Sequence, residues 1–269
     1  MAELFGDLPP FFAYLTTLFL GLCLGSFATA LAWRLPRGVS MTAKARSSCT
    51  ACGHDLSALD LVPLFSWVFL RGRCRHCRAP VSWRYPLIEL ATLVLCATFH
   101  YRFGFSLETL CAFAMAPALV AMVDIDFRYK ILPDVLNATV FAAGLLAIAL
   151  SAVHAFDAPA HVLAMMGQAT LGVIIYGGGS WALRWLFMVW KKREALGLGD
   201  VKFFAASGVW LGSSIDALAG YLLLSGVCGV LAALVWRRAT GEVEFPFGPA
   251  LIGAFLAVLL WRGLYFVVI

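Results

Sequence analysis

Residues 11–33 read FFAYLTTLFLGLCLGSFATALAW and contain no charged side chain. A helix of about 20 apolar residues spans a bilayer, because only a helix or a closed barrel satisfies all backbone polar groups where water is absent. A barrel strand would show a short stretch of strict alternation between apolar and polar residues, and this run shows none. The run therefore predicts a membrane-spanning helix.

Apolar runs of the same kind recur along the chain, which has 269 residues, 62% of them hydrophobic and 13% charged. Soluble domains have roughly 45–50% apolar and about 25% charged residues, so a water-soluble globule is excluded. We expect an all-α, polytopic membrane helical bundle of about eight transmembrane helices. The expected spans are residues 11–33, 86–101, 105–123, 133–153, 160–188, 200–213, 216–236 and 247–267. The sixth is short, and seven spans are the alternative.

Lysine and arginine are concentrated in alternate loops between these runs. Such residues near short loops stay in the cytoplasm, which predicts basic loops inside and both termini outside. The net charge of +5 then reflects topology and anionic lipid, and requires no nucleic-acid partner. Glu3 and Asp7 precede the first run without any Lys or Arg, the wrong flank for a cleavable signal peptide, so we expect the run to be retained as an anchor. The basic residues of the expected cytoplasmic loops are Arg34, Arg37, Lys44, Arg46, Arg71, Arg73, Arg75, Arg78, Arg84, Arg128, Lys130, Lys191, Lys192, Arg193, Arg237 and Arg238.

Four of the eight cysteines form two C-x-x-C pairs in the polar loop after the first span, Cys49 with Cys52 and Cys74 with Cys77. Each pair can present two thiolates to one ion, and two pairs about twenty residues apart complete a tetrahedral shell, so the spacing predicts zinc. Two disulfides or a redox pair are the alternative, which the reducing cytoplasm disfavours. A shell filled by four cysteines has no open position, so we expect a structural zinc.

The cysteine loop divides the chain into three expected parts. Residues 1–33 hold the periplasmic N-terminal end and the first transmembrane helix, residues 34–85 the cytoplasmic four-cysteine zinc-binding loop, and residues 86–269 the remaining transmembrane helices. A transporter, a rival kind of membrane protein with buried carboxylates, usually has paired inverted halves. The sequence shows no internal repeat of that kind.

Acidic residues are scarce in the apolar runs, and an ionisable group there is a functional candidate by default. Asp124 and Asp126 end the third expected span and Asp200 begins the sixth, so all three face the cytoplasm and can meet at one depth. Two close carboxylates do not both ionise easily, so one keeps a proton while the other acts as a base toward water. This is the requirement of an aspartyl peptidase. Gly197 and Gly199 permit a tight turn and the close approach of a substrate strand.

These polar residues also have local explanations. Asp124 and Asp126 are two apart on a helix and point to roughly opposite sides, so at most one of them can pair with Asp200. Asp200 is equally well explained as a first-turn residue favoured by the helix dipole, and Asp134 as a helix cap. Lys202 either extends to the membrane interface or contacts substrate or an acidic side chain.

Several motifs follow one another along nearly the whole chain. They are Gly25-Ser26-Phe27, Arg34-Leu35-Pro36, the two cysteine pairs with Asp60-Leu61-Val62-Pro63 between them, Arg84-Tyr85-Pro86-Leu87-Ile88-Glu89, Asp124-Ile125-Asp126, Leu132-Pro133-Asp134, Gly197-Leu198-Gly199-Asp200-Val201-Lys202 and Phe245-Pro246-Phe247-Gly248-Pro249. In this order they resemble the type IV prepilin peptidases, the leader peptidase/N-methyltransferases of the peptidase A24 type with a GxGD aspartate.

The resemblance implies an aspartic endopeptidase that removes the basic leader peptide of type IV prepilins or type II secretion pseudopilins at the cytoplasmic face of the bacterial inner membrane. It implies Asp124 and Asp200 as the catalytic pair, and S-adenosylmethionine as methyl donor for N-methylation of the new N-terminus. The cysteine loop and Glu89 match the region linked to the methyltransferase. Prepilins or pseudopilins and membrane lipid are the expected partners. Support of the active site is expected from Asp126, Glu89, Gly197, Gly199 and Lys202.

The sequence departs from the family pattern at Thr29, Thr50 and Arg78, where the family commonly has Asn, Pro and Gly. No glycine-rich turn for S-adenosylmethionine is found. The alternatives are therefore a peptidase without methyltransferase activity and a membrane assembly protein that uses its zinc loop for docking. An assembly protein would have no use for a GxGD aspartate opposite a DxD motif.

Overall fold

The computed structural model describes residues 9–41, 47–154, 159–192 and 196–266. Within these ranges the regular structure is helical, with no strand. Some residues that bear on the expected anchor and topology lie outside the described ranges, namely Glu3, Asp7, Lys44, Arg46 and Arg193.

Long helices follow the expected apolar runs in order, which confirms the all-α bundle. They are α2 (Pro10–Arg34), α4 (Arg84–Phe103), α5 (Leu107–Tyr129), α6 (Asp134–His154), α7 (Pro159–Val173) continued by the π-helical η3 (Ile174–Gly178) and by α8 (Gly179–Lys191), α9 (Leu198–Leu211), α10 (Ile215–Thr240) and α11 (Gly248–Arg262). Length and composition make five stretches candidate membrane spans, Pro10–Arg37, Leu107–Tyr129, Asp134–Val153, Pro159–Lys191 and Ile215–Thr240. The full number of about eight crossings stays a prediction.

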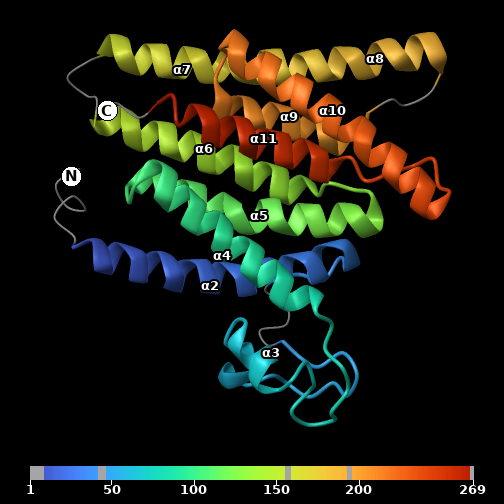
Figure 1. Ribbon diagram of the computed structural model, residues 1–269. Coiled ribbons are helices and arrows are strands. Elements are labelled where there is room, and N and C mark those ends of the chain that lie inside the picture. Colours follow the sequence, from blue (N-terminus) through green and yellow to red (C-terminus); the bar gives the residue numbers. More distant parts are fainter. Residues whose placement is uncertain (1–8, 42–46, 155–158, 193–195, 267–269) are drawn as a thin grey trace.

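The helices lie side by side in one bundle, and the cysteine loop forms a separate lobe beneath α2 and α4 (Figure 1). Helix α2 packs against α4 and α5, α5 against α6, α6 and α7 against α9, and α10 against α11. Helix α2 begins and α11 ends at the same end of the bundle, while α5, α8 and α10 end at the opposite end (Figure 1). The end of α5 and the start of α9, which carry the aspartates, share that opposite end.

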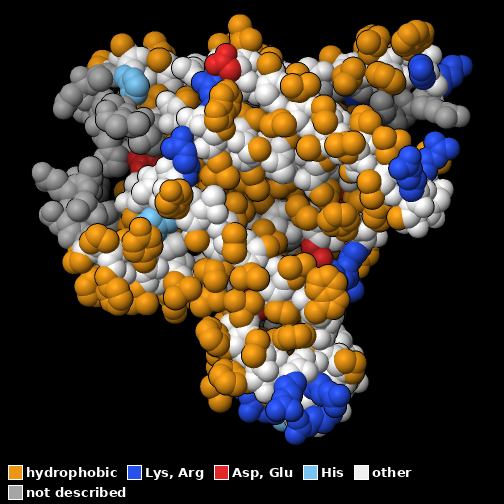
Figure 2. Space-filling model, viewed as in Figure 1, with side chains coloured by type: hydrophobic (Ala, Val, Ile, Leu, Met, Phe, Trp, Pro, Cys, Tyr) orange, Lys and Arg blue, Asp and Glu red, His pale blue; other side chains and the backbone are white. Residues whose placement is uncertain are grey.

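Helix α5 is central in the bundle. In its most apolar stretch of 18 residues, 67% is buried inside the bundle. Phe113, Leu119, Met122 and Ile125 expose 2% or less of their surface. The most apolar stretch of α10 is only 17% buried, and apolar side chains cover much of the bundle exterior (Figure 2). An apolar exterior of this extent suits contact with lipid. The packing around α5 fixes the position of the aspartates at its end.

Helices α7 and α9 pack backbone against backbone. A Cβ added to Gly172 would lie 2.3 Å from the carbonyl oxygen of Gly208, and one added to Gly208 would lie 2.5 Å from the carbonyl carbon of Gly172. Small residues allow close approach of helices in membranes, where packing replaces the hydrophobic effect between them. This contact holds α9, and with it Asp200, against the long α7–α8 helix.

We expect Gly172→Ala to destabilise the protein, because the added methyl group forces α7 away from α9. Overpacking of this kind costs about 1–3 kcal/mol. Gly167→Ala in the same helix is the matched control, since a Cβ there meets no atom within 4 Å. Thermal unfolding in detergent should show a lower midpoint for Gly172→Ala only, and equal midpoints for the two variants would contradict the close packing.

Candidate active site and metal centre

Asp126 is a buried carboxylate near the end of α5, with 4% of its surface exposed. Its Oδ2 accepts a hydrogen bond of 2.7 Å from the backbone N–H of Gly248, the first residue of α11. Helix starts leave N–H groups without intrahelical partners, and Asp126 satisfies one of them. A Cβ at Gly248 would lie 2.8 Å from the same carboxylate oxygen, so glycine is needed for this approach.

Asp200 lies in the first turn of α9 and bonds to the residue that precedes the helix. Its Oδ2 accepts a hydrogen bond of 3.2 Å from the backbone N–H of Gly197. A Cβ at Gly197 would lie 2.9 Å from that oxygen. The helix-start role expected for Asp200 is therefore present, and it leaves the carboxylate at the same end of the bundle as Asp126.

The connection between α5 and α6 packs against the start of α9. A Cβ at Gly199 would lie 2.9 Å from the carbonyl oxygen of Leu132, and the side-chain amide of Asn137 donates a 3.2 Å hydrogen bond to the carbonyl oxygen of Gly199. The close approach expected at Gly199 is thus made by the chain itself. A Cβ at Gly248, which binds Asp126, would lie 2.9 Å from Cδ2 of the same Leu132. Leu132 therefore lies against both the residue that binds Asp126 and the turn that carries Asp200, and a direct meeting of the two aspartates stays a prediction.

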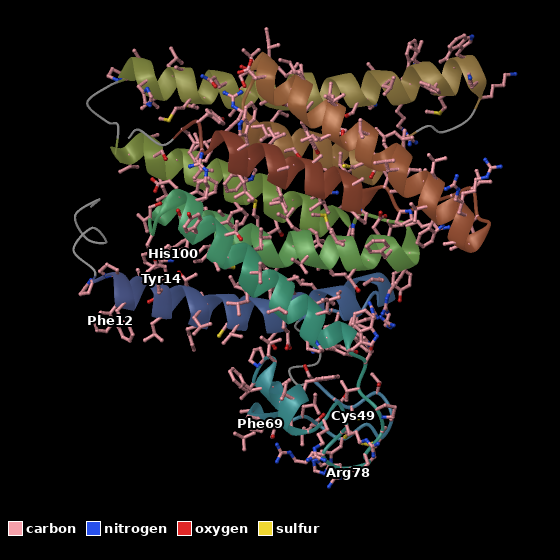
Figure 3. The ribbon with its side chains drawn as sticks, in the orientation of Figure 1. Phe12, Tyr14, Cys49, Phe69, Arg78 and His100 are labelled. Atoms are coloured by element: carbon pink, nitrogen blue, oxygen red, sulfur yellow. The ribbon has the colours of Figure 1, made fainter. Side chains whose placement is uncertain are left out.

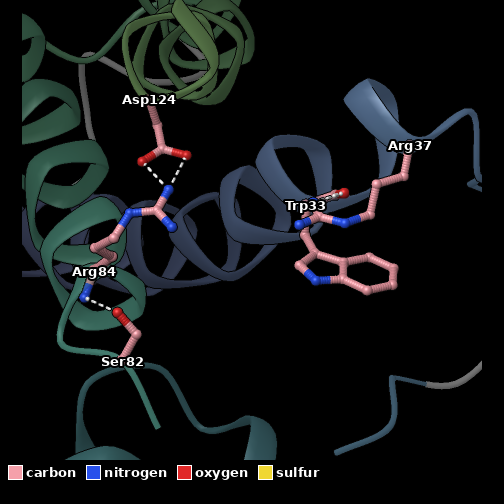
Figure 4. A network of polar contacts seen from close by, with 5 residues as sticks. All are labelled: Trp33, Arg37, Ser82, Arg84 and Asp124. Atoms are coloured by element: carbon pink, nitrogen blue, oxygen red, sulfur yellow. Dashed lines mark hydrogen bonds and ion pairs between the residues drawn. The ribbon is translucent and has the colours of Figure 1, made fainter. Parts of the chain in front are cut away.

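Asp124 points to another side of α5 and pairs with Arg84 (Figure 4). Nη2 of Arg84 lies 2.5 Å from Oδ2 of Asp124 and also contacts its Oδ1. Arg84 is the first residue of α4, and its N–H donates to Oγ of Ser82 at 3.3 Å. Asp124 is therefore tied to the end of the cysteine loop, and the two aspartates of the DxD motif face different partners, as their spacing predicts.

Lys202 has a partner outside the aspartate pair. Its Nζ lies 2.6 Å from Oδ1 of Asp134, and the two side chains are 48% and 71% exposed. Of the roles expected for Lys202, contact with an acidic side chain is the one observed. Exposed ion pairs of this kind contribute little to stability.

Glu89 supports the cysteine loop and not the aspartates. Its Oε2 accepts a 2.7 Å hydrogen bond from the N–H of Leu64, whose φ is 62° and ψ is −51°. The N–H of Phe65 bonds to the carbonyl oxygen of Pro63 at 2.7 Å, which closes a γ-turn. Such turns with positive φ are rare and strained. Glu89 thus fixes the point at which the short helix α3 (Phe65–Phe69) begins.

Arg84, Asn137 and Gly248 contact the site, but sequence reasoning assigns them no role in it. A signal exists for Gly248, because a glycine before a proline at a helix start has a free N–H and no side chain. Arg84 stands out in the sequence through its charge and through its place in the motif Arg84-Tyr85-Pro86-Leu87-Ile88-Glu89, neither of which indicates a contact with Asp124. Asn137 has no local signal at all, since its contact with α9 depends on tertiary packing.

The four cysteines converge within the lobe, where Figure 3 labels Cys49. The four sulfur atoms lie within 4.8 Å of one another, and Sγ of Cys49 lies 3.9 Å from Sγ of Cys77. Tetrahedral zinc with bonds of about 2.3 Å to sulfur separates its sulfur ligands by about 3.8 Å. The arrangement fits a four-thiolate metal site, and it confirms that the two C-x-x-C pairs face a common centre.

The two cysteine pairs share one backbone conformation. The N–H groups of Cys49 and Cys74 each donate a 2.9 Å hydrogen bond to the carbonyl oxygen five residues later, and their carbonyl oxygens accept from Gly53 and Arg78. Gly53 has a φ of 72° and Arg78 a φ of 61°. Glycine adopts this left-handed conformation without steric cost, whereas arginine does not. The family departure at Arg78 therefore falls on a position that favours glycine.

Hydrogen bonds lower the pKa of two groups in the lobe, Cys49 and Asp60. The backbone N–H groups of Cys52 and Ala51 lower the pKa of Cys49 to about 6, whereas burial and the neighbouring thiols raise the pKa of Cys77 to about 11. Oδ2 of Asp60 accepts from the hydroxyl of Ser57 at 2.6 Å, and Oδ1 accepts from Arg75 at 2.7 Å. These contacts, that with Ser57 first, lower the pKa of Asp60 to about 2. An ionised Asp60 connects the turn η2 (Ala58–Leu61) to the second cysteine pair.

Two family models match successive parts of the chain, and the boundary between the two matches falls near the start of α5. Residues 19–103 match the bacterial peptidase A24 N-terminal domain, and residues 113–234 match the type IV leader peptidase family. The first match contains the cysteine lobe and Arg84, and the second contains the three aspartates. No solved structure matches the chain.

Curated relatives match over most of the chain. A prepilin leader peptidase/N-methyltransferase of Pseudomonas aeruginosa is 31% identical over 272 aligned positions, which cover 92% of this chain and 90% of the relative. A type 4 prepilin-like proteins leader peptide-processing enzyme of Escherichia coli is 32% identical, with 91% and 93% covered. A prepilin leader peptidase/N-methyltransferase of Burkholderia pseudomallei is 41% identical over 80% of this chain, and this match spans 66% of the relative's length, just under two thirds.

We expect Arg78→Gly to stabilise the metal-binding turn, because it removes the cost of a left-handed arginine, about 1 kcal/mol. Gly53→Ala at the equivalent turn should destabilise it by a similar amount, since no atom lies within 4 Å of the new Cβ and only the backbone conformation changes. Competition of a chelator for the bound metal measures both effects. Equal metal retention by the two variants would contradict this account.

Proposed function

Because the chain belongs to the type IV leader peptidase family, we propose that it is an aspartic endopeptidase that removes the basic leader of type IV prepilins or type II secretion pseudopilins. The observation that carries the proposal is that Asp126 and Asp200 are both held by backbone N–H groups at one end of the helical bundle, on elements that pack against Leu132. We assign this end to the cytoplasmic face of the bacterial inner membrane, with both termini in the periplasm, because basic residues are concentrated in its loops.

Two carboxylates supply what peptide hydrolysis requires. Interacting carboxylates do not both ionise easily, so one retains a proton and the other is ionised. The protonated group donates a hydrogen bond to the carbonyl oxygen of the scissile peptide, and the ionised group takes a proton from the attacking water. Backbone N–H groups of Gly248 and Gly197 hold Asp126 and Asp200 in place.

We propose Asp126 as the partner of Asp200. The sequence resemblance pairs Asp200 with Asp124, and that assignment stays a prediction. The contacts favour Asp126, because it bonds to Gly248, which packs against Leu132 as Gly199 of the α9 start does. Both oxygens of Asp124 instead contact Arg84. Asp124 would have to leave Arg84 before it could exchange a proton with water or substrate.

The acidic groups near the site suit a basic leader. Asp134 pairs with Lys202, and Oε2 of Glu242 accepts a 2.8 Å hydrogen bond from Lys130, which lowers the pKa of Glu242. Exposed ion pairs are weak, so a basic leader can replace these lysines at the carboxylates. The apolar helix that follows the leader can meanwhile remain in the bilayer, beside the apolar exterior of the bundle.

We propose zinc as the metal of the four-cysteine site, with residues 34–85 forming a cytoplasmic zinc-binding unit and residues 86–269 the peptidase helices. Four thiolates fill a tetrahedral shell, so the ion organises the lobe and supplies no chemistry to the peptide. The lobe reaches the helices through Arg84, which contacts Asp124, and through Leu64, which bonds to Glu89.

We also propose N-methylation of the new N-terminus with S-adenosylmethionine as methyl donor, following the names of the relatives. An apolar cavity between α6 and α7 does not fit this donor, because its lining offers no charged or hydrogen-bonding side chain to the amino-acid and ribose groups. We assign no donor site and derive no step through it. The cavity is lined by Ala152, Val153, Pro159, Val162, Leu163 and Met166.

We expect Asp126→Asn and Asp200→Asn each to lower the rate of leader removal by about 10²–10⁴-fold, the contribution of general acid–base catalysis. Asp124→Asn should retain most of the activity, because Asp124 is engaged by Arg84. The assay incubates detergent-purified protein with a purified prepilin and follows the shift in mass.

Arg84→Gln is the matched control, since it releases Asp124 and leaves the proposed pair unchanged. Activity lost in Asp124→Asn and kept in Asp126→Asn would return the assignment to Asp124. Activity kept in both Asp126→Asn and Asp200→Asn would reject the peptidase and favour the membrane assembly protein.

Freshly purified protein should contain about one zinc ion per chain, because four thiolates make one closed site. Cys74→Ser should lose most of the metal, and Cys228→Ser, an exposed cysteine on α10, should keep it. Elemental analysis by mass spectrometry measures both. Well under one zinc ion in the unaltered protein would contradict the site.

Methyl transfer has a separate test. Labelled S-adenosylmethionine and a prepilin that has already lost its leader should give a labelled N-terminus, and Asp200→Asn should not reduce this labelling, because cleavage is no longer required. A protein that cleaves prepilin and transfers no label would be a peptidase alone.

A further inference from the structure

The cysteine lobe has an apolar edge that its own fold leaves uncovered. Phe65, Val68 and Phe69 lie three and four residues apart on one face of α3, and they are 53%, 64% and 81% exposed. Leu59 and Val62 in the preceding segment are exposed as well. Figure 3 shows Phe69 at the edge of the lobe. A cluster of exposed apolar side chains on an otherwise polar loop marks an interaction surface.

The edge lies level with the apolar part of the bundle and not beyond it. Glu89, which binds the N–H of Leu64 just before α3, is the sixth residue of α4 and so lies about 7 Å inside the start of that helix. A Cβ at Gly25 of α2 would lie 2.8 Å from the carbonyl oxygen of Glu89, and Gly25 precedes the end of α2 at Arg34 by about 13 Å. Figure 1 accordingly shows α3 level with the second half of α2.

The neighbouring surface of the bundle is also apolar. Trp83, Leu87, Leu90 and Val94 are exposed and follow one face of α4 at helical spacing. Tryptophan is enriched at the level of the lipid headgroups, and Trp83 stands at the start of this face. In Figure 2 apolar side chains on the margin of the lobe adjoin those of the bundle.

The base of the lobe is basic. Arg71, Arg73 and Arg78 are exposed around the second cysteine pair, and Figure 2 shows the cations gathered there. Figure 3 places Arg78 at the base, apart from Phe69. Apolar side chains with adjoining cations are typical of segments that lie in the interface of anionic membranes.

We propose that α3 and the turn before it lie in the bilayer itself, at the boundary between headgroups and acyl chains. Phe65, Val68 and Phe69 then contact acyl chains, while the arginines contact anionic headgroups. Interfacial segments bury their apolar face by about 5–10 Å, which agrees with the depth at which Glu89 holds the start of α3. Lipid is the occupant of the apolar edge because the edge lies inside the end of the apolar helix α2 and continues the exposed apolar face of α4.

The test places a photoreactive benzoyl-phenylalanine at Phe69 of the full-length protein, reconstituted without substrate in nanodiscs of phosphatidylcholine and phosphatidylglycerol. The same probe at Arg78 is the matched control, because it lies on the basic side of the same lobe. After illumination, mass spectrometry counts lipid adducts at each position. We expect several-fold more adduct at position 69 than at position 78, because position 69 contacts the C–H bonds of acyl chains, into which the probe inserts, whereas position 78 lies at the headgroups.

Two results would overturn the proposal. One is an equal yield of lipid adduct at the two positions, including none at either. The other is an adduct at position 69 to a second protein chain in place of lipid, which would make the edge a protein–protein surface. Metal content is measured for both probe proteins, so that a lobe that fails to fold is recognised. The readout needs no cleavage and is therefore independent of the proposed peptidase activity.

Discussion

Helix starts supply the hydrogen-bond donors on which the site depends. In a bilayer the backbone bonds within its own helix, so spare N–H groups occur only in the first turns. Gly248 at the start of α11 donates to Asp126, and Gly197 before α9 donates to Asp200. A carboxylate in an apolar bundle requires such partners. The aspartates are therefore found at one end of the bundle, where α9 and α11 begin and α5 ends.

Helix α4 connects the cysteine lobe to this site. Arg84 in its first turn contacts Asp124 on α5, and Glu89 in its second turn bonds to Leu64 ahead of α3. None of the hydrogen bonds described above joins the four cysteines to Asp126 or Asp200. Arg84, at the end of the cysteine loop, nevertheless contacts Asp124 of α5. A structural metal centre can thus influence the site through positions of helices, without any ligand in common.

The helices were accessible to prediction because apolar length is a property of each run alone. The runs 11–33 and 133–153 differ from α2 (Pro10–Arg34) and α6 (Asp134–His154) by one residue at each end. The run 105–123 falls short of α5, which continues to Tyr129, since polar residues at the membrane surface remain helical although they are not apolar. The common centre of the cysteine pairs was likewise predictable, because two thiols three residues apart already define half of a tetrahedral site.

By itself the sequence determined the helical bundle, the four-cysteine centre and the presence of two aspartate positions at one end of the bundle, because each follows from local spacing or composition. Only the tertiary structure decided the contacts of these aspartates. Helical periodicity directs Asp124 and Asp126 to different sides of α5, but it does not say which side faces the start of α11 and which faces Arg84. That choice depends on how α4 and α11 pack against α5, and packing between segments far apart in the chain leaves no local signal.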